Sequence, residues 1–156
     1  MASGLKKVAG SKIYISDAAV TYKSVVESSD FSTTAWTEIK GWNSTGDLGA
    51  EQATLTQTLI NQNITLYDKG VISFPIMTNV FVPMPTDPGQ VAFIAAQAAK
   101  EPYAFKIEWD AEPAVDTGDT DLFYGFAMFG TKTGGDVSAG RLLNFPIQPI
   151  AKFISE

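Results

Sequence analysis

The sequence predicts a mainly β (α+β) protein, an antiparallel β-sandwich or barrel with one flanking α-helix at about residues 87–100. Three observations support this fold class: repeated short segments in which apolar and polar residues alternate, turn residues between these segments, and one segment with helical periodicity. Many strands with a single helix favour an antiparallel sheet that the helix covers on one flank. At 156 residues, the chain has the size of one domain with a substantial core.

Most of the chain has the composition of β-strands. Strands are expected within residues 13–15, 19–22, 36–42, 53–60, 64–67, 71–82, 103–112, 121–131 and 142–153. Loops or turns are expected at residues 28–34, 43–49, 68–70, 116–120 and 134–136. Pro75 predicts an edge, a bulge or a break within its run. The segment 121–131 is apolar on both faces, which predicts a central strand or half of an interface.

One segment carries the signals of a helix. Asp87 is a suitable N-cap, Pro88 fits the first helical position, and Gln90 stands three residues after Asp87, as in a capping box. The expected apolar stripe facing the core consists of Val91, Ile94, Ala95 and Ala98. Lys100 is expected in the last turn, and Pro102 prevents continuation.

Composition narrows the possible functions. The chain has no cysteine and no histidine, so disulfides, thiolate metal sites, cysteine nucleophiles and histidine bases are excluded. The net charge of −6 disfavours tight binding to nucleic acid, whose phosphates attract Lys and Arg. The N-terminus lacks the apolar core of a signal peptide, and no apolar run has the length of a membrane span. We expect a flexible arm at residues 1–10, a single domain at 11–156, and synthesis in the cytoplasm.

Several acidic residues suggest chemistry that their surroundings do not support. Asp116-Thr117-Gly118 matches the core of an aspartic protease, but the residues before it do not form a buried strand. Asp116, Asp119 and Asp121 offer carboxylates for calcium without the spacing of an EF-hand. A polar turn explains both patterns. Glu108 and Asp110 have the residue type required for a small carboxylate-dependent hydrolase, but nothing indicates a cleft.

The segment 106–112 alternates charged and apolar residues. As a strand, it places one set of side chains on a single face, namely Lys106, Glu108, Asp110 and Glu112. An ordinary solvent-exposed face explains this alternation. The acidic wall of a channel is the alternative interpretation.

The order of these features resembles that of siphophage tail tube (major tail) proteins. The matching features are the short arm, the strand 12–15, the Trp-containing strand 36–42 with its Gly turn at 46–49, the Thr-rich strand at 53–56, the turn at 68–70, the Asp-Pro start of the helix at 87–90 and the strand 103–107. The resemblance covers nearly the whole chain, and no single motif in it is diagnostic. The chain departs from the family pattern at Pro75 and shows no immunoglobulin-like domain after Phe153.

The resemblance implies a non-enzymatic virion protein without metal or cofactor. It would assemble into hexameric rings that stack, with other tail proteins, into a phage tail tube for passage of double-stranded DNA, without membrane contact. Glu108 and its neighbours on the 106–112 face are then candidates for the lumen. Candidates for stacking between rings are Lys6, Lys7, Asp47, Asp68 and Lys69. Two other functions remain open: the hydrolase above, and a carbohydrate-binding or adhesin-like module that uses Trp36, Trp42 and Trp109.

Overall fold

The structure is a computed structural model that describes residues 8–109 and 119–155. Its strands are β1 (Lys12–Ser16), β2 (Trp36–Ile39), β3 (Trp42–Ser44), β4 (Glu51–Leu59), β5 (Ile64–Ser73), β6 (Met77–Phe81), β7 (Tyr103–Glu108), β8 (Thr120–Ala127), β9 (Lys132–Thr133), β10 (Leu142–Pro149) and β11 (Ile154–Ser155). Its helices are η1 (Ser28–Phe31) and α1 (Pro88–Ala98). Every strand pairing is antiparallel. The expected mainly β fold with one flanking α-helix is therefore confirmed.

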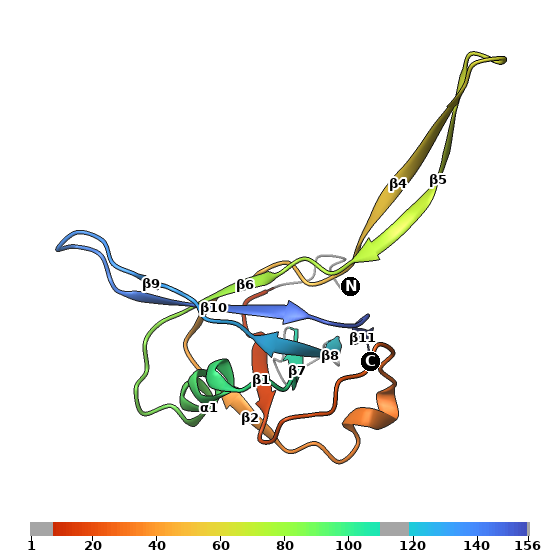
Figure 1. The fold of residues 1–156 in the computed structure, drawn as a ribbon. Coiled ribbons are helices and arrows are strands. Elements are labelled where there is room, and N and C mark those ends of the chain that lie inside the picture. Colours follow the sequence, from red (N-terminus) through yellow and green to blue (C-terminus); the bar gives the residue numbers. More distant parts are fainter. Residues whose placement is uncertain (1–7, 110–118, 156) are drawn as a thin grey trace, which may run out of the picture.

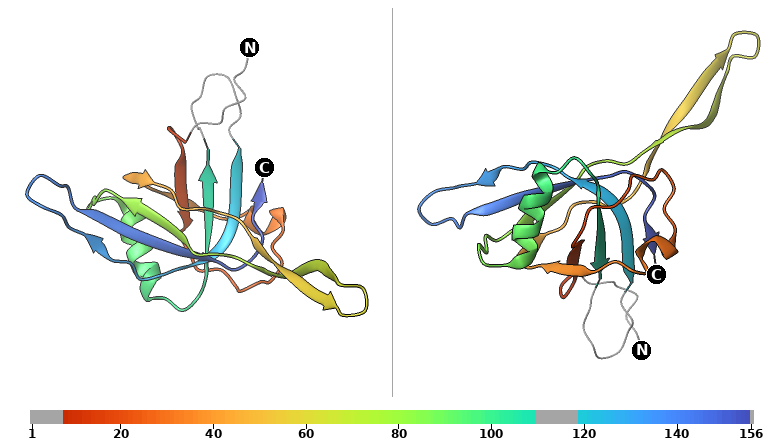
Figure 2. Two further views of the ribbon diagram at one scale, coloured as in Figure 1. Left: turned by 90° about the horizontal axis from the view of Figure 1, so that it is seen from above. Right: turned by 60° about the horizontal axis from the view of Figure 1, so that its bottom comes forward.

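The main sheet curls around one core. Its strands lie in the order β2-β1-β7-β8-β10-β6-β3, with β11 added at β8 and β9 at β10. Although β2 and β3 lie at opposite ends of this order, only Lys40 and Gly41 separate them in sequence. Gly41 has φ +84°, a conformation that glycine adopts readily. This corner brings the two ends of the sheet together, so the sheet forms a half-barrel with α1 on its flank (Figures 1 and 2).

The main sheet bends at Gly125, where the pairing of β8 changes from β7 to β10. The first part of β8 pairs with β7, whereas Gly125 to Ala127 pair with β10. A Cβ atom on Gly125 would lie 2.9 Å from the Ile147 side chain, so a residue with a side chain would be crowded at this bend. The buried centre of β8 agrees with the central strand predicted from residues 121–131.

The larger core lies between α1 and the concave side of the sheet. Phe93 of α1 is fully buried, and its ring centroid lies 4.4 Å from that of Phe145 in β10. The expected helix stripe is wrong: α1 buries Gly89, Gln90, Phe93 and Ala96. Val91 and Ile94 are instead 54% and 53% exposed. The aromatic ring of Phe93 fills the core, and the helix is rotated about its axis to place it there.

Asp87 and Gln90 attach α1 to the corner between β2 and β3. The Asp87 Oδ2 atom accepts hydrogen bonds from the backbone N–H groups of Gln90 (3.0 Å) and Lys40 (3.1 Å), which confirms the N-cap. The Gln90 side chain does not complete the expected capping box. Its Nε2 donates to the carbonyl groups of Lys40 (2.7 Å) and Val82 (2.8 Å), while its Oε1 accepts from the Met84 N–H (2.9 Å). Gln90, which the sequence places in a local capping box, therefore makes a tertiary contact instead.

A second, smaller core covers the opposite face of the sheet. Phe31 of η1 packs edge-on against Tyr124 of β8, with ring centroids 5.2 Å apart. Val26, Ala104, Leu122 and Ala151 complete this cluster. The polar segment 28–34, expected as a loop, thus contains a short 3-10 helix that presents one aromatic residue. The strand expected at residues 19–22 does not form.

The strands β4 and β5 form a long hairpin that pairs with no other described strand and projects away from the half-barrel (Figure 1). The turn expected at residues 68–70 is wrong, because β5 continues through these residues and the chain reverses at residues 60–63. The register shifts near Gly70, where a Cβ atom would lie 2.9 Å from the Ala53 carbonyl oxygen. Gly70 therefore permits a close crossing within the hairpin.

Other boundaries follow from local chemistry. Pro75 separates β5 from β6, which confirms the predicted break. Residues 42–44, expected partly as a turn, form the short strand β3. The strand expected at residues 142–153 ends at Pro149 as β10, and the short strand β11 follows it. Helix α1 ends at Ala98, two residues before the expected end.

Candidate assembly surfaces

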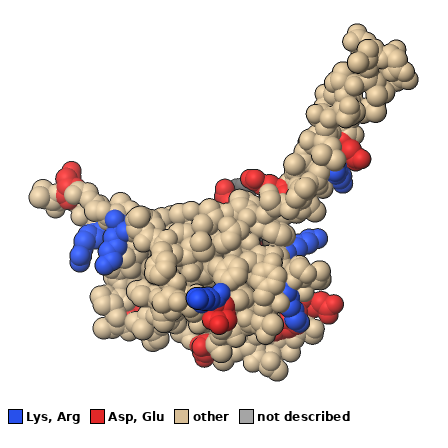
Figure 3. All heavy atoms as spheres, in the orientation of Figure 1, with Lys and Arg blue, Asp and Glu red and all other residues tan. Residues whose placement is uncertain are grey.

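The β4–β5 hairpin exposes apolar side chains far from the body. Leu55, Ile64 and Leu66 are each about half exposed (57%, 51% and 49%), and Ile60 at the tip is 98% exposed. No charged residue lies between Thr54 and Tyr67, and the outer part of the hairpin is accordingly free of charge in Figure 3. An isolated hairpin with exposed apolar residues and free edges is typical of a surface that another chain covers.

Each face of the hairpin has its own chemistry. Directly paired residues share a face, and the pairs are Leu55 with Asp68, Gln57 with Leu66, and Leu59 with Ile64. These residues form the aliphatic face of the hairpin. The pairs on the other face are Thr54 with Lys69, Thr56 with Tyr67, and Thr58 with Thr65. The sequence predicted the alternation of residues 53–60, but only the register of the hairpin shows which β5 residues share each face with them.

The residues expected to mediate stacking lie in or near this hairpin. Asp47 is exposed in the segment between β3 and β4. Asp68 and Lys69 lie in β5 and point to opposite faces of the hairpin. Lys6 and Lys7 lie outside the described residues. A role of these residues in stacking stays a prediction.

Of the four lumen candidates, Lys106 and Glu108 lie in β7 on the side of the sheet that carries the smaller core. The Lys106 Nζ atom lies 3.2 Å from Glu108 Oε1 and 4.4 Å from the ring centroid of Tyr14. Both side chains line a shallow polar recess of about 460 Å³ beside η1. The ion pair offsets part of the acidic charge on this face. Asp110 and Glu112 lie outside the described residues.

Tyr14 contacts both Lys106 and Glu108, and its acidity is clearly altered. Its hydroxyl donates a hydrogen bond to Glu108 Oε2 at 3.2 Å. Burial, followed by the nearby Glu108 carboxylate, raises the pKa of Tyr14 to about 12. The neutral phenol therefore remains a hydrogen-bond donor throughout the physiological range.

Of the residues suggested for catalysis or metal binding, Glu108 and Asp121 have structural contacts in the described part of the chain. The Asp121 carboxylate accepts hydrogen bonds from Trp109 Nε1 and from the Ser155 hydroxyl, both at 2.6 Å. Within residues 8–109 and 119–155, no cluster of acidic side chains has the arrangement of a metal site. The motif at residues 116–118 lies outside the described residues.

The tryptophans do not form a common platform for a sugar. Trp42 and Trp109 pack against the larger core with their ring centroids 6.1 Å apart. Trp36 packs against the smaller core, where its ring stacks on that of Phe31. Because the two cores lie on opposite faces of the sheet, this arrangement does not favour the carbohydrate-binding alternative.

Comparison with solved structures identifies the same fold in tube-forming particles. The chain superposes on the phage SPP1 tail tube with a TM-score of 0.60 and 11% identity, covering 96% of this chain and 79% of that one. The chain has the fold of tail tube proteins. Its match to the sheath/tube terminator of the extracellular contractile injection system PVC has a TM-score of 0.70 and 12% identity, covering 100% and 99% of the two chains.

A component of the anti-feeding prophage baseplate gives a TM-score of 0.71 at 7% identity, covering 100% of this chain and 97% of that one. No protein-family model matches the sequence, and neither does any curated protein sequence. The similarity is thus one of fold, as expected from the order of elements in the sequence. The helices of the described part are too short or too polar to cross a membrane.

Proposed function

We propose that this protein is a structural, non-catalytic subunit of a phage tail tube or a related tube, which assembles into stacked rings. The single observation that carries this proposal is the β4–β5 hairpin, which leaves the body of a tail-tube fold and exposes aliphatic side chains that no other described part of the chain covers. Another copy of the chain that covered these side chains would remove their apolar surface from water.

Ring formation follows from the free edges of the sheet. The outer edge of β2 and the β4–β5 hairpin both carry backbone groups that no described strand pairs. Pairing between such edges gives a contact that repeats around a ring. The baseplate assembly of the anti-feeding prophage is described as six-fold symmetrised, and we infer a hexameric ring for this chain. Asp47, Asp68 and Lys69, with the N-terminal residues Lys6 and Lys7, are then contacts between stacked rings.

We infer that the tube conducts double-stranded DNA without binding it specifically. The net charge of −6 supports this, because an acidic wall repels a polyanion that must slide. Lys106 and Glu108 largely offset each other, so an acidic lumen at this strand would depend on Asp110 and Glu112. The protein would thus be located in the virion tail together with other tail proteins.

The likeness to the PVC terminator makes a tail-end ring the second candidate function. Electron microscopy and sedimentation of concentrated protein distinguish the two. A tube subunit will form tubes of variable length, whereas a terminator will form single rings. A protein that stays monomeric at high concentration, even with a tail-tip complex present, would contradict both.

A further inference from the structure

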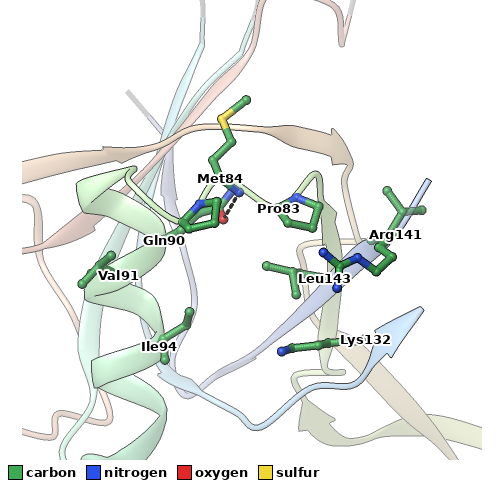
Figure 4. A pocket seen from close by; sticks show the side chains of 10 residues that line it. Pro83, Met84, Gln90, Val91, Ile94, Lys132, Arg141 and Leu143 are labelled. Atoms are coloured by element: carbon green, nitrogen blue, oxygen red, sulfur yellow. Dashed lines mark hydrogen bonds between the residues drawn. The ribbon is translucent and has the colours of Figure 1, made fainter. Parts of the chain in front are cut away.

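A pocket of about 240 Å³ lies between α1 and the arm formed by β9 and β10 (Figure 4). These elements lie at the opposite end of the molecule from the hairpin (Figure 1). Both α1 and the β9–β10 arm contribute apolar side chains to the pocket. Its lining includes Pro83, Val91, Ile94, Leu142 and Leu143. The half-exposed Val91 and Ile94 thus form one wall of this pocket. They are the face of α1 that the sequence had placed in the core.

Two basic side chains stand at the other wall. Lys132 of β9 and Arg141, which precedes β10, line the pocket opposite α1 (Figure 4). In the described part of the chain, neither has an acidic partner within ion-pair distance. The pocket therefore fits an aliphatic segment that carries a carboxylate.

The aliphatic face of the hairpin has this chemistry. Leu66 and Ile64 lie there beside Asp68, which is the only charged residue of the paired set on that face. The pocket of the same chain is out of reach, because the hairpin and the β9–β10 arm project from opposite ends of the body (Figure 1). The occupant that these observations select is a second copy of this chain.

We propose that the aliphatic face of the hairpin of one copy docks in the α1–β9 pocket of another copy, where Asp68 pairs with Arg141. This inference rests on the proposed assembly, and it identifies the hairpin–pocket contact as one that holds neighbouring copies together. The guanidinium of Arg141 suits a carboxylate because its planar N–H groups form two parallel hydrogen bonds. Since the hairpin and the pocket are different surfaces, the contact is head-to-tail and continues from copy to copy.

Cysteine pairs test this contact directly, because the natural chain has no cysteine. The double variant Leu66→Cys/Val91→Cys should form a ladder of disulfide-linked multimers under mild oxidation, while each single variant stops at dimers. The matched control is Thr65→Cys/Val91→Cys, whose first cysteine lies on the opposite face of the hairpin. We expect about ten-fold less ladder from this control, because its cysteine points away from the pocket and its sulfur cannot reach the cysteine at position 91 with disulfide geometry.

Charge exchange gives an independent test. Asp68→Arg places like charges together and should raise the protein concentration required for assembly about ten-fold or more. Combining it with Arg141→Asp should restore assembly, with circular dichroism confirming that each variant is folded. A ladder without this rescue would reject the ion pair.

The outcomes for the contact and for the proposed function differ. Tubes or rings that form without a Leu66→Cys/Val91→Cys ladder would overturn the docking site and leave the assembly intact. A ladder without rings or tubes would support the contact and reject the tube function. The absence of both would overturn both.

Discussion

The side chain of Gln90 should be the strongest single polar contribution to the stability of this fold. It is 2% exposed and makes three hydrogen bonds to backbone groups of the β2–β3 corner and the segment after β6. Replacing it by Met keeps the length of the side chain but removes all three bonds. The carbonyl groups of Lys40 and Val82 and the N–H of Met84 then lose their Gln90 partner.

The magnitude follows from the number of bonds. Each hydrogen bond contributes about 1 kcal/mol net, and a buried group left without a partner costs about 1–3 kcal/mol. Gln90→Met should therefore lower the free energy of unfolding by about 3–5 kcal/mol. That is a large share of the roughly 5–15 kcal/mol typical of a domain.

Urea unfolding monitored by tryptophan fluorescence measures this change, with the shift in midpoint interpreted at a constant slope. The control is Gln97→Met on the same helix, where one exposed hydrogen bond to the Met128 carbonyl (3.1 Å) is lost. This control should cost about 1 kcal/mol or less. If the two variants unfold at the same urea concentration, the corner does not depend on Gln90 and the reasoning is wrong.

Three further predictions concern single residues. Gly89→Ala places a Cβ atom 2.0 Å from the Glu38 carbonyl oxygen and should lower the free energy of unfolding by about 3 kcal/mol or more. The control Gly134→Ala adds a Cβ atom with no other atom within 4 Å and should be nearly neutral. Thermal unfolding measures both. The pKa of Tyr14 lies above that of an unfolded tyrosine (10.0), so the folded state retains its proton longer and stability should fall as pH rises from about 10 to about 12. Tyr14→Phe should flatten this fall in urea titrations, and an unchanged slope would contradict it. If the β7 face lines the lumen, Glu108→Lys particles should assemble but eject DNA more slowly at low salt; normal ejection at every salt concentration would place this face outside the DNA path.

Local patterns were enough to predict much of the fold. The Asp87-Pro88 start of the helix depends on the backbone chemistry of the first turn, and it appears where the sequence placed it. Pro75 lacks a backbone N–H, so its break between β5 and β6 was also readable. The two-faced apolar character of residues 121–131 predicted cover on both sides, and the two cores provide it for Leu122 to Ala127. Phe129, beyond the end of β8, is 78% exposed.

Tertiary contacts decided which surfaces are free. Ile94 and Phe93 are neighbours in sequence and both apolar, and only the shape of the core determined that Phe93 is buried. The hairpin shows the same limit, because residues 68–70 have turn composition while the true reversal ends at Asn63 with φ 50°. Neither difference has a local signal.

The sequence by itself determined the strand-rich composition, the single helix, the acidic balance and the resemblance to tail tube proteins. The tertiary structure decided that Lys106 pairs with Glu108, and that the hairpin and the β9–β10 arm lie at opposite ends of the body. The physical reason is that periodicity shows which side chains share a face, whereas burial depends on what packs against that face. For a buried face the partner comes from a distant part of the chain, and for the hairpin the proposed partner is a second copy.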